Sequence, residues 1–417
     1  MIIKRDLYLQ RLLNSRNNGM IKVITGMRRS GKSYLLFNLF ADALAKEGVP
    51  ADHIVAVNLE DRRNSQLRDP DNLLAYIDAR LTDKDMHYIL LDEIQMVKEF
   101  EDVLNSYLHV KNADVFVTGS NAKFLSKDVI TEFRGRGQSI MVHPLNYAEF
   151  MSAQHNSDSY DMNLLLEYMQ YGGLPKVVTT DDENEKKEYL QSLFVQTYLR
   201  DIKERYSIQL DHDLEELIDV IASGIGTLTN PHKIQNTFRS VKQSSITQDT
   251  IKNYLDYMQD AFIINKTVRY DIKGRRYIDT PAKYYFEDLG LRNARLNFRQ
   301  TEEPHLMENL IFNELRIRGY SVDVGQLMLF GKNADGKSER RQLEVDFVCN
   351  RGYERLYIQS AFALPTIEKQ QELNSLKRIN DSFQKVVIVG GMQPTYRNDD
   401  GILILNVFDF LSGKVAI

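Results

Sequence analysis

Short apolar runs alternate with helical patterns through the first third of the chain. The runs cover residues 21–25, 86–91, 114–118 and 139–142. Continuous apolar runs of this length are typical of strands buried on both faces, as in a parallel sheet. Helical patterns follow the first and third runs, at residues 34–40 and 122–133. The pattern therefore predicts an α/β domain over residues 1–150, in which helices sandwich a parallel sheet.

The rest of the chain changes pattern three times. A polar stretch after residue 150 indicates a loop, and the helical pattern that resumes at Met162 predicts a helical lid or linker over residues 151–209. Residues 210–300 contain three short helical patterns followed by two β-rich runs. Residues 301–417 begin with a helical pattern and continue with strand-like runs, which predicts a small α/β domain.

The segment between the first strand and its following helix has the sequence Gly-Met-Arg-Arg-Ser-Gly-Lys-Ser, which is a Walker A motif. Its glycines let backbone N–H groups surround phosphates, Lys32 places a positive charge on the β and γ oxygens, and Ser33 offers a hydroxyl to Mg²⁺. We therefore predict ATP and Mg²⁺ as cofactors. The predicted nucleotide-binding residues are Gly26, Met27, Arg28, Arg29, Ser30, Gly31, Lys32, Ser33 and Tyr34.

The second apolar run ends in Asp92-Glu93, which is the pattern of a Walker B motif. A parallel strand would deliver both carboxylates at the edge of the sheet where the Walker A loop lies. We expect Asp92 to help hold Mg²⁺ and Glu93 to orient and deprotonate the attacking water. This prediction includes hydrolysis as well as binding.

Two further positions are candidates for catalysis. The third strand ends in Ser120-Asn121, and either side chain could contact the γ-phosphate or its water. This order of strands and motifs resembles the AAA+ ATPase module, in which the polar residue after this strand is called sensor 1. The resemblance also implies an arginine finger just before the last core strand, where Arg134 and Arg136 stand. Each arginine could instead cap a helix, and a finger could act within one subunit or between subunits.

Composition permits this interpretation and limits its setting. Apolar residues make up 43% of 417 residues, and 53 basic against 58 acidic residues give a net charge of −5, so any nucleic-acid surface must be local. One cysteine, Cys349, excludes an intramolecular disulfide framework. The N-terminal residues lack the apolar core of a signal peptide, and no apolar run reaches the length of a membrane span. We expect a cytoplasmic protein without a membrane partner.

The region 210–300 resembles a winged helix. Three helical patterns precede the β-rich runs, and a cationic stretch lies between those runs. Phosphate binding needs such cations, so double-stranded DNA is a candidate partner. The predicted recognition helix contributes only one base, Lys252, so a structural or protein-docking role stays open. The cationic residues are Lys266, Arg269, Lys273, Arg275 and Arg276.

The last region resembles the restriction-endonuclease-like fold. Glu308 on a helix and Asp346 on a strand match two of its catalytic acids, but Gln359-Ser360-Ala361 stands where the family has Glu-x-Lys. The missing carboxylate and ammonium make metal-dependent nuclease activity unexpected.

The whole chain resembles prokaryotic, archaeal-type AAA+ ATPases that carry a C-terminal domain of unknown function. Besides the Walker motifs, the strings that carry this resemblance are residues 171–175, 198–202 and 344–347. The resemblance implies an ATPase with accessory domains. Two functions stay open: an ATPase that couples nucleotide state to DNA binding, or a nucleotide-controlled switch or scaffold whose partner is another protein or a further copy of the chain.

Overall fold

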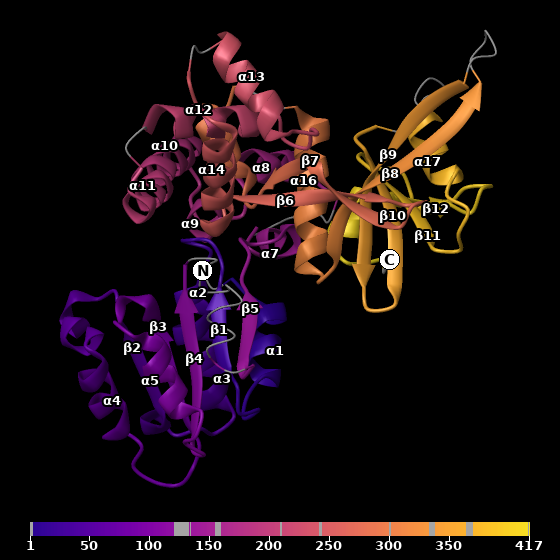
Figure 1. The fold of residues 1–417 in the computed structure, drawn as a ribbon. Helices are drawn as coiled ribbons and strands as arrows, with labels where there is room; N and C mark the ends of the chain where they lie inside the picture. Colours follow the sequence, from indigo (N-terminus) through magenta and orange to yellow (C-terminus); the bar gives the residue numbers. More distant parts are fainter. Residues whose placement is uncertain are drawn as a thin grey trace. The chain divides into compact units, whose positions relative to one another are not determined.

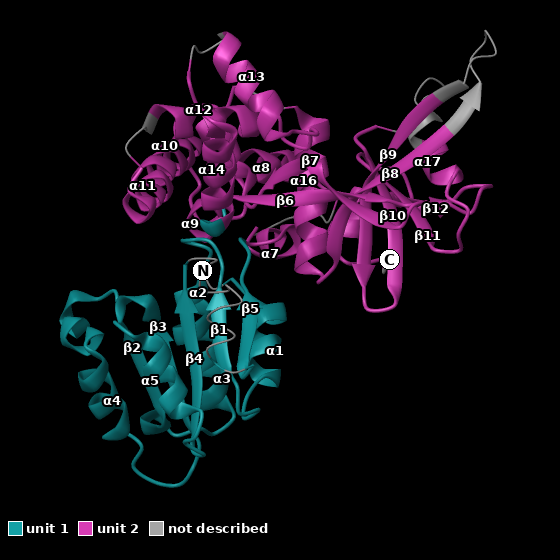
Figure 2. Ribbon diagram, in the orientation of Figure 1, with its two compact units in different colours: residues 1–144, 260–262 teal, residues 145–259, 263–417 magenta. Residues whose placement is uncertain are grey.

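The computed structural model divides the chain into two compact units. Unit 1 comprises residues 1–144 with 260–262, and unit 2 comprises residues 145–259 and 263–417 (Figures 1 and 2). The residues that the structure describes are 3–120, 133, 135–154, 160–208, 211–241, 244–299, 302–332, 338–363, 370–415 and 417.

Unit 1 is built on a sheet that has five parallel strands among the described residues, in the order β2-β3-β4-β1-β5. The α/β fold predicted for this region is confirmed, although β2 was not among the predicted strands. The strands are β1 (Ile21–Thr25), β2 (Ile54–Asn58), β3 (His87–Asp92), β4 (Ala113–Gly119) and β5 (Gly137–Met141).

Helices cover both faces of this sheet (Figure 1). Alternate residues of each strand point to opposite faces, so one strand can pack against helices on both sides. Ile89 and Leu91 pack with α4 and α5, whereas Leu90 and Phe116 pack with α1 and the helix that follows β1. The helical segments are α1 (Asp6–Asn14), α2 (Lys32–Tyr34), the π-helical η1 (Leu35–Phe40), α3 (Ala41–Lys46), η2 (Ala51–His53), η3 (Arg62–Arg68), α4 (Pro70–Asp78), η4 (Ile94–Met96) and α5 (Phe100–Tyr107).

Unit 2 begins with helices. Asn146 caps α7 through a capping box with Glu149, and Thr247 caps α14 by accepting a hydrogen bond from the backbone N–H of Thr250. The helices are α7 (Tyr147–Ser152), α8 (Met162–Tyr171), α9 (Pro175–Val178), α10 (Glu183–Leu193), η6 (Phe194–Leu199), α11 (Arg200–Tyr206), α12 (Asp211–Ser223), α13 (Pro231–Val241) and α14 (Gln248–Asp260).

The rest of unit 2 is organised around a mixed sheet, in the order β12-β13-β11-β10-β9-β8-β6-β7 among the described residues. It combines β6 and β7, which precede residue 300, with strands that follow it. The domain limits at 150, 209 and 300 stay predictions. The elements are β6 (Ile264–Asp271), β7 (Arg276–Phe286), α15 (Leu289–Arg295), α16 (Glu303–Ile317), β8 (Ser321–Lys332), β9 (Ser338–Arg351), β10 (Glu354–Ala361), α17 (Gln370–Lys377), β11 (Gln384–Val389), β12 (Tyr396–Arg397), β13 (Leu403–Asn406) and α18 (Val407–Leu411).

Two details of this sheet differ from or extend the sequence pattern. Residues 321–332 form a single strand, β8, whose register against β9 shifts near Gly325, where an added Cβ atom would lie 2.8 Å from that of Val345. Thr229, between α12 and α13, bridges to Ala282 of β7. Three helices, a bridge and the β6–β7 hairpin follow the order of a winged helix, which stays a prediction.

The Tyr-Gly-Gly turn at residues 171–173 packs against the start of α15. Buried Asp288 accepts a hydrogen bond from the Gly173 N–H at 2.8 Å, and a Cβ on Gly290 would lie 2.0 Å from the Tyr171 carbonyl oxygen. Burial raises the pKa of Asp288 to about 6, although backbone N–H groups oppose the shift. This close approach explains why the turn and α15 need glycines.

Candidate functional site

The loop between β1 and α2 is shaped by residues with positive φ: Gly26 at 140°, Arg29 at 64° and Gly31 at 95°. A Cβ on Gly26 would lie 2.1 Å from the carbonyl oxygen of Val142, so only glycine fits there. Arg5 donates a hydrogen bond to the carbonyl of Ser30 at 2.9 Å and fixes the far side of the loop. Of the other predicted loop residues, Met27 and Ser30 are buried, Arg28 is half-buried, and Arg29 and Tyr34 are exposed.

Lys32 lies inside this loop. Its Nζ donates hydrogen bonds to the carbonyl oxygens of Gly26 and Met27, each at 2.9 Å, and the residue is only 4% exposed. Burial lowers the pKa of Lys32 to about 8, and the charges of Glu93 and Asp92 partly oppose this shift. The lysine therefore belongs to one electrostatic site with the two Walker B carboxylates.

Asp92, at the end of β3, meets two hydroxyl groups. Its Oδ1 accepts hydrogen bonds from Ser33 Oγ at 3.0 Å and from Thr118 Oγ1 at 2.5 Å. Burial raises the pKa of Asp92, while these two hydrogen bonds act in the opposite direction. Thr118 was missed by sequence reasoning. The pairing of Leu91 with Val117 in the parallel register of β3 and β4 places it beside Asp92.

Glu93 follows with the left-handed backbone conformation φ 54°, ψ 51°. Its backbone N–H donates to Thr118 Oγ1 at 3.0 Å, and its carboxylate accepts hydrogen bonds from Ser120 Oγ and Gln95 Nε2. Ser120, one of the two candidates at the end of β4, thus contacts the predicted catalytic carboxylate directly. Asn121 lies outside the described residues.

Of the two candidate arginine fingers, the structure describes only Arg136. Arg134 lies outside the described residues, whereas the backbone carbonyl of Arg136 accepts a hydrogen bond from the Ile21 N–H at 2.9 Å. β1 and β5 are parallel and pair Ile21 with Gly137, so Arg136 lies at the amino edge of the sheet. The Walker A loop starts at the opposite edge, after Thr25. The structure therefore does not bring Arg136 to the phosphate loop of its own chain.

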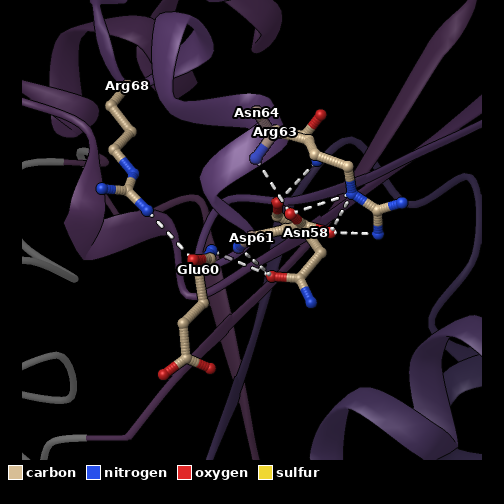
Figure 3. A network of polar contacts seen from close by, with 6 residues as sticks. All are labelled: Asn58, Glu60, Asp61, Arg63, Asn64 and Arg68. Carbon is tan, nitrogen blue, oxygen red and sulfur yellow. Dashed lines mark hydrogen bonds and ion pairs between the residues drawn. The ribbon is translucent and has the colours of Figure 1, made fainter.

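A segment after β2 is a further part of this region that the sequence did not indicate. Asn58 Oδ1 accepts hydrogen bonds from the N–H groups of Glu60 and Asp61, and Arg68 donates to the Glu60 carbonyl at 3.0 Å (Figure 3). Figure 3 shows the Glu60 carboxylate pointing away from this network. Its charge acts on Lys32. A third carboxylate, besides those of Glu93 and Asp92, therefore influences the pKa of the lysine.

In unit 2, the sequence-predicted pair Glu308 and Asp346 is joined by Lys283 of β7 and Glu344 of β9. Lys283 Nζ lies 2.9 Å from Glu308 Oε1 and 2.7 Å from Glu344 Oε1. Burial alone would lower the pKa of Lys283, but the three carboxylates raise it above its ordinary value. Sequence reasoning missed Lys283. A lone lysine in the apolar run that ends at Phe286 was the available signal.

Gln359 and the neighbouring backbone complete this cluster. The Ser360 N–H donates to Asp346 Oδ2 at 2.8 Å, and Gln359 Oε1 accepts from the Asp346 N–H at 3.3 Å. Burial, and next the charge of Glu308, raise the pKa of Asp346 to about 8. The cluster thus has an ammonium, but it comes from β7 and not from the strand where the restriction-endonuclease-like pattern has its lysine.

The strand order β2-β3-β4-β1-β5, with a phosphate loop after β1 and paired acids after β3, defines a P-loop ATPase of the AAA+ class. Residues 18–151 match the family described as an AAA domain, and residues 162–302 match a domain of unknown function (DUF8612). An uncharacterised protein of Haemophilus influenzae is 36% identical over 414 residues, which cover 98% of each chain. The chain belongs to the same family as that protein, the archaeal-type AAA+ P-loop ATPases that carry a domain of unknown function.

More distant similarities extend over much of the chain. The uncharacterised protein MJ1544 of Methanocaldococcus jannaschii is 28% identical over 386 residues, covering 90% of this chain and 81% of that protein. The Aeropyrum pernix Orc1 protein, solved in complex with DNA, is 11% identical with a TM-score of 0.32, covering 73% of this chain and 94% of Orc1. Protein VC1899 from Vibrio cholerae is 10% identical with a TM-score of 0.21, covering 95% and 97%. These TM-scores are too low to support an inference about function.

Among the helices that the structure describes, none combines the length and the apolar composition needed to cross a bilayer.

Proposed function

We propose that this AAA+ protein binds ATP with Mg²⁺ and hydrolyses it. The observation that carries the proposal is the 3.0 Å contact between Ser33 Oγ and Asp92 Oδ1, beside a phosphate loop with Lys32 inside it. A hydroxyl and a carboxylate are hard oxygen donors of the kind that Mg²⁺ prefers, so Ser33 and Asp92 would hold the ion. Bound Mg²⁺ would neutralise charge on the β and γ phosphates.

The remaining steps belong to the side chains of the chain itself. Lys32 would leave the Gly26 and Met27 carbonyls and place its ammonium on the phosphate oxygens. Glu93 would accept a proton from the attacking water, and Ser120 would orient the Glu93 carboxylate. Glu60 is a third acid whose charge acts on Lys32, after Glu93 and Asp92, and it is the natural comparison for Glu93.

Nucleotide affinity and single-turnover hydrolysis of three variants test this proposal. We expect Lys32→Ala to lose most of its ATP affinity, because a phosphate-binding cation is removed. Glu93→Gln should keep ATP affinity and slow hydrolysis at least ~100-fold, in line with loss of a general base. Glu60→Gln is the matched control and should hydrolyse ATP near the wild-type rate. Wild-type hydrolysis by Glu93→Gln, or slow hydrolysis by Glu60→Gln alone, would contradict the assignment of Glu93.

We further propose that nucleotide state is coupled to binding of double-stranded DNA by the β6–β7 hairpin. Lys273 and Arg275 are exposed in the turn of this hairpin, and the described residues offer them no acidic partner within ion-pair distance. Exposed cations at a hairpin turn suit contact with phosphates. The turn is thus the part of the cationic stretch that supports the proposal.

The alternative is a nucleotide-controlled protein-binding switch, and it is favoured by the pairing of the other cations. Lys266 lies 2.6 Å from Asp279, and Arg269 donates to the carbonyl of Thr280 at 2.8 Å and to Gln326 Oε1 at 2.9 Å. A cation that is already paired in this way contributes less to binding the DNA phosphate backbone.

Stimulation of ATP turnover by duplex DNA, together with DNA affinity at several salt concentrations, separates the two functions. For the DNA function we expect stimulation and an affinity that falls steeply with salt, and Lys273→Ala/Arg275→Ala should reduce the salt slope by about 2, near one for each lost phosphate contact. Lys176→Ala on α9 serves as the control, because it removes an exposed charge of unit 2 outside the hairpin and the predicted recognition helix. ATP turnover that duplex DNA does not stimulate, together with no measurable binding of the DNA, would favour the protein-binding switch.

A further inference from the structure

A cluster of two histidines and one aspartate lies at the amino edge of the unit 1 sheet. His53 immediately precedes β2 and His87 begins β3, and the parallel register that pairs Ile54 with Tyr88 places the two histidines side by side. His53 is 5% exposed and His87 is fully buried. With Asp83, from the loop before β3, they bring one ligand atom each to within 4.8 Å of one another.

The buried ring of His87 presents an unused lone pair. Its Nδ1 lies 2.8 Å from the carbonyl oxygen of Asp85, and because a carbonyl only accepts, Nδ1 must carry the proton. In the neutral ring, Nε2 then has a lone pair and no proton. This Nε2 is enclosed and has no hydrogen-bond partner among the described residues. A ring that donates through one nitrogen to a backbone carbonyl while the other nitrogen is available is the arrangement of metal-bound histidines.

Hydrogen bonds fix the position of Asp83 beside His53, the other two candidate ligands. Asp83 Oδ1 accepts a hydrogen bond from the Asp85 N–H at 2.8 Å, and Asp83 Oδ2 lies 3.2 Å from His53 Nε2. Asn112 also donates to the Asp83 carbonyl at 2.7 Å. The loop therefore directs one carboxylate oxygen toward His53.

We propose that His53, Asp83 and His87 bind a divalent transition-metal ion of the Zn²⁺ type. Two imidazole nitrogens and one carboxylate oxygen suit such borderline ions, whereas Mg²⁺ and Ca²⁺ prefer oxygen donors alone. Three protein ligands leave a coordination position for water or another group. The imidazole rings stack with centroids 4.1 Å apart and planes at 17°, so they must tilt for both nitrogens to face one ion.

This site is separate from the nucleotide site. β3 begins at His87 and ends at Asp92, so the two sites lie at opposite edges of the same sheet, about 17 Å apart at 3.3 Å per residue. Zn²⁺ binding at the histidines should therefore not require nucleotide and should persist when Mg²⁺ saturates the oxygen ligands of the Walker motifs.

The test uses the untagged full chain, stripped of metal with a chelator and kept free of nucleotide. Zn²⁺ is titrated by calorimetry with Mg²⁺ in excess, and the melting temperature is measured with Zn²⁺ or with Mg²⁺ alone. We expect one Zn²⁺ per chain and a melting temperature that rises with Zn²⁺ but not with Mg²⁺. Asp83→Asn and His53→Asn should each weaken Zn²⁺ binding at least ~10-fold.

Asp83→Asn is the most informative variant because Asp83 is about half exposed and Asn retains an oxygen for the Asp85 N–H. The matched control is His212→Asn, which removes a histidine that lies 3.2 Å from Glu216 on α12 in unit 2 and should leave Zn²⁺ affinity unchanged. Equal Zn²⁺ affinity in wild type, Asp83→Asn and His53→Asn would overturn the proposal, as would a wild-type melting temperature that does not respond to Zn²⁺.

Discussion

At the scale of single residues, the charged cluster in unit 2 shows how burial and charge decide protonation together. Lys283 provides one ammonium for three carboxyl groups, those of Glu308, Glu344 and Asp346, so two of them have no cation of the cluster to neutralise them. The lysine already lies between two of the acids, and a divalent ion would have to compete with it. We therefore expect no metal-dependent DNA cleavage.

The raised pKa of Asp346 predicts a pH dependence of stability. Below its ordinary pKa near 4, Asp346 is protonated in both states, but between about pH 4 and 8 the folded chain keeps a proton that the unfolded chain releases. This group should therefore lower the free energy of unfolding as pH rises, by at most about 1.4 kcal/mol per pH unit. Asp346→Asn resembles the protonated form, so it should gain stability relative to wild type from pH 5 to pH 8. Urea unfolding of both proteins across this range measures the difference, and a constant difference would refute the shift.

At the scale of elements, the turn after α8 and the start of α15 hold each other in place through close backbone contacts. Gly173 donates to Asp288, while Gly290 lies against the Tyr171 carbonyl. The contacted atom at Gly290 is a backbone oxygen, which cannot rotate away as a flexible side chain could. Packing of the two elements therefore depends on the absence of a Cβ atom at Gly290.

Gly290→Ala should lower the free energy of unfolding by about 3 kcal/mol, at the upper end of typical overpacking effects. Gly319→Ala is the control, since Gly319 has a φ of 84° but no atom within 4 Å of the added Cβ. The φ of Gly290 is not positive, so Gly319→Ala gives the size of a loss from backbone strain alone, about 1 kcal/mol, against which the loss at Gly290 is compared. Denaturant unfolding compares the two, and equal effects would mean that the contact with Tyr171 is not tight.

At the scale of the whole molecule, the position of Arg136 bears on assembly. Its backbone lies at the amino edge of the sheet, about 17 Å along β1 from the start of the phosphate loop. That separation is longer than an arginine side chain. If Arg136 is an arginine finger, it must therefore serve the nucleotide site of a second copy of the chain.

Mixing two inactive variants tests this role. Arg136→Ala should slow ATP turnover with little loss of ATP affinity, because a finger acts on charge in the transition state. Added Glu93→Gln protein would donate an intact Arg136 to the intact Glu93 site of Arg136→Ala, so turnover should partly recover. Turnover is measured alongside a check that mixed oligomers have formed. If such oligomers show no recovery, Arg136 has a structural role.

Features formed by neighbours in the sequence could be predicted without the structure. The Walker A loop binds through consecutive residues, so its glycines, Lys32 and Ser33 identified it directly. Buried strands such as β3 are apolar between their first and last residues, which made them visible as runs. The N-cap at Thr247 is likewise a contact between close neighbours. β2 was missed although its first four residues are also apolar; it lies at the edge of the sheet, where only alternate positions are buried.

Contacts between distant residues depend on strand register and on helix docking, which local periodicity does not encode. Thr118 meets Asp92 because β3 and β4 pair in one register, and His53 meets His87 because β2 and β3 do. Lys283 reaches Glu308 and Glu344 only when β7, α16 and β9 come together in three dimensions. The tertiary structure therefore decided which buried charges and lone pairs share a site, since their free energies depend on neighbours in space and not on neighbours in the chain.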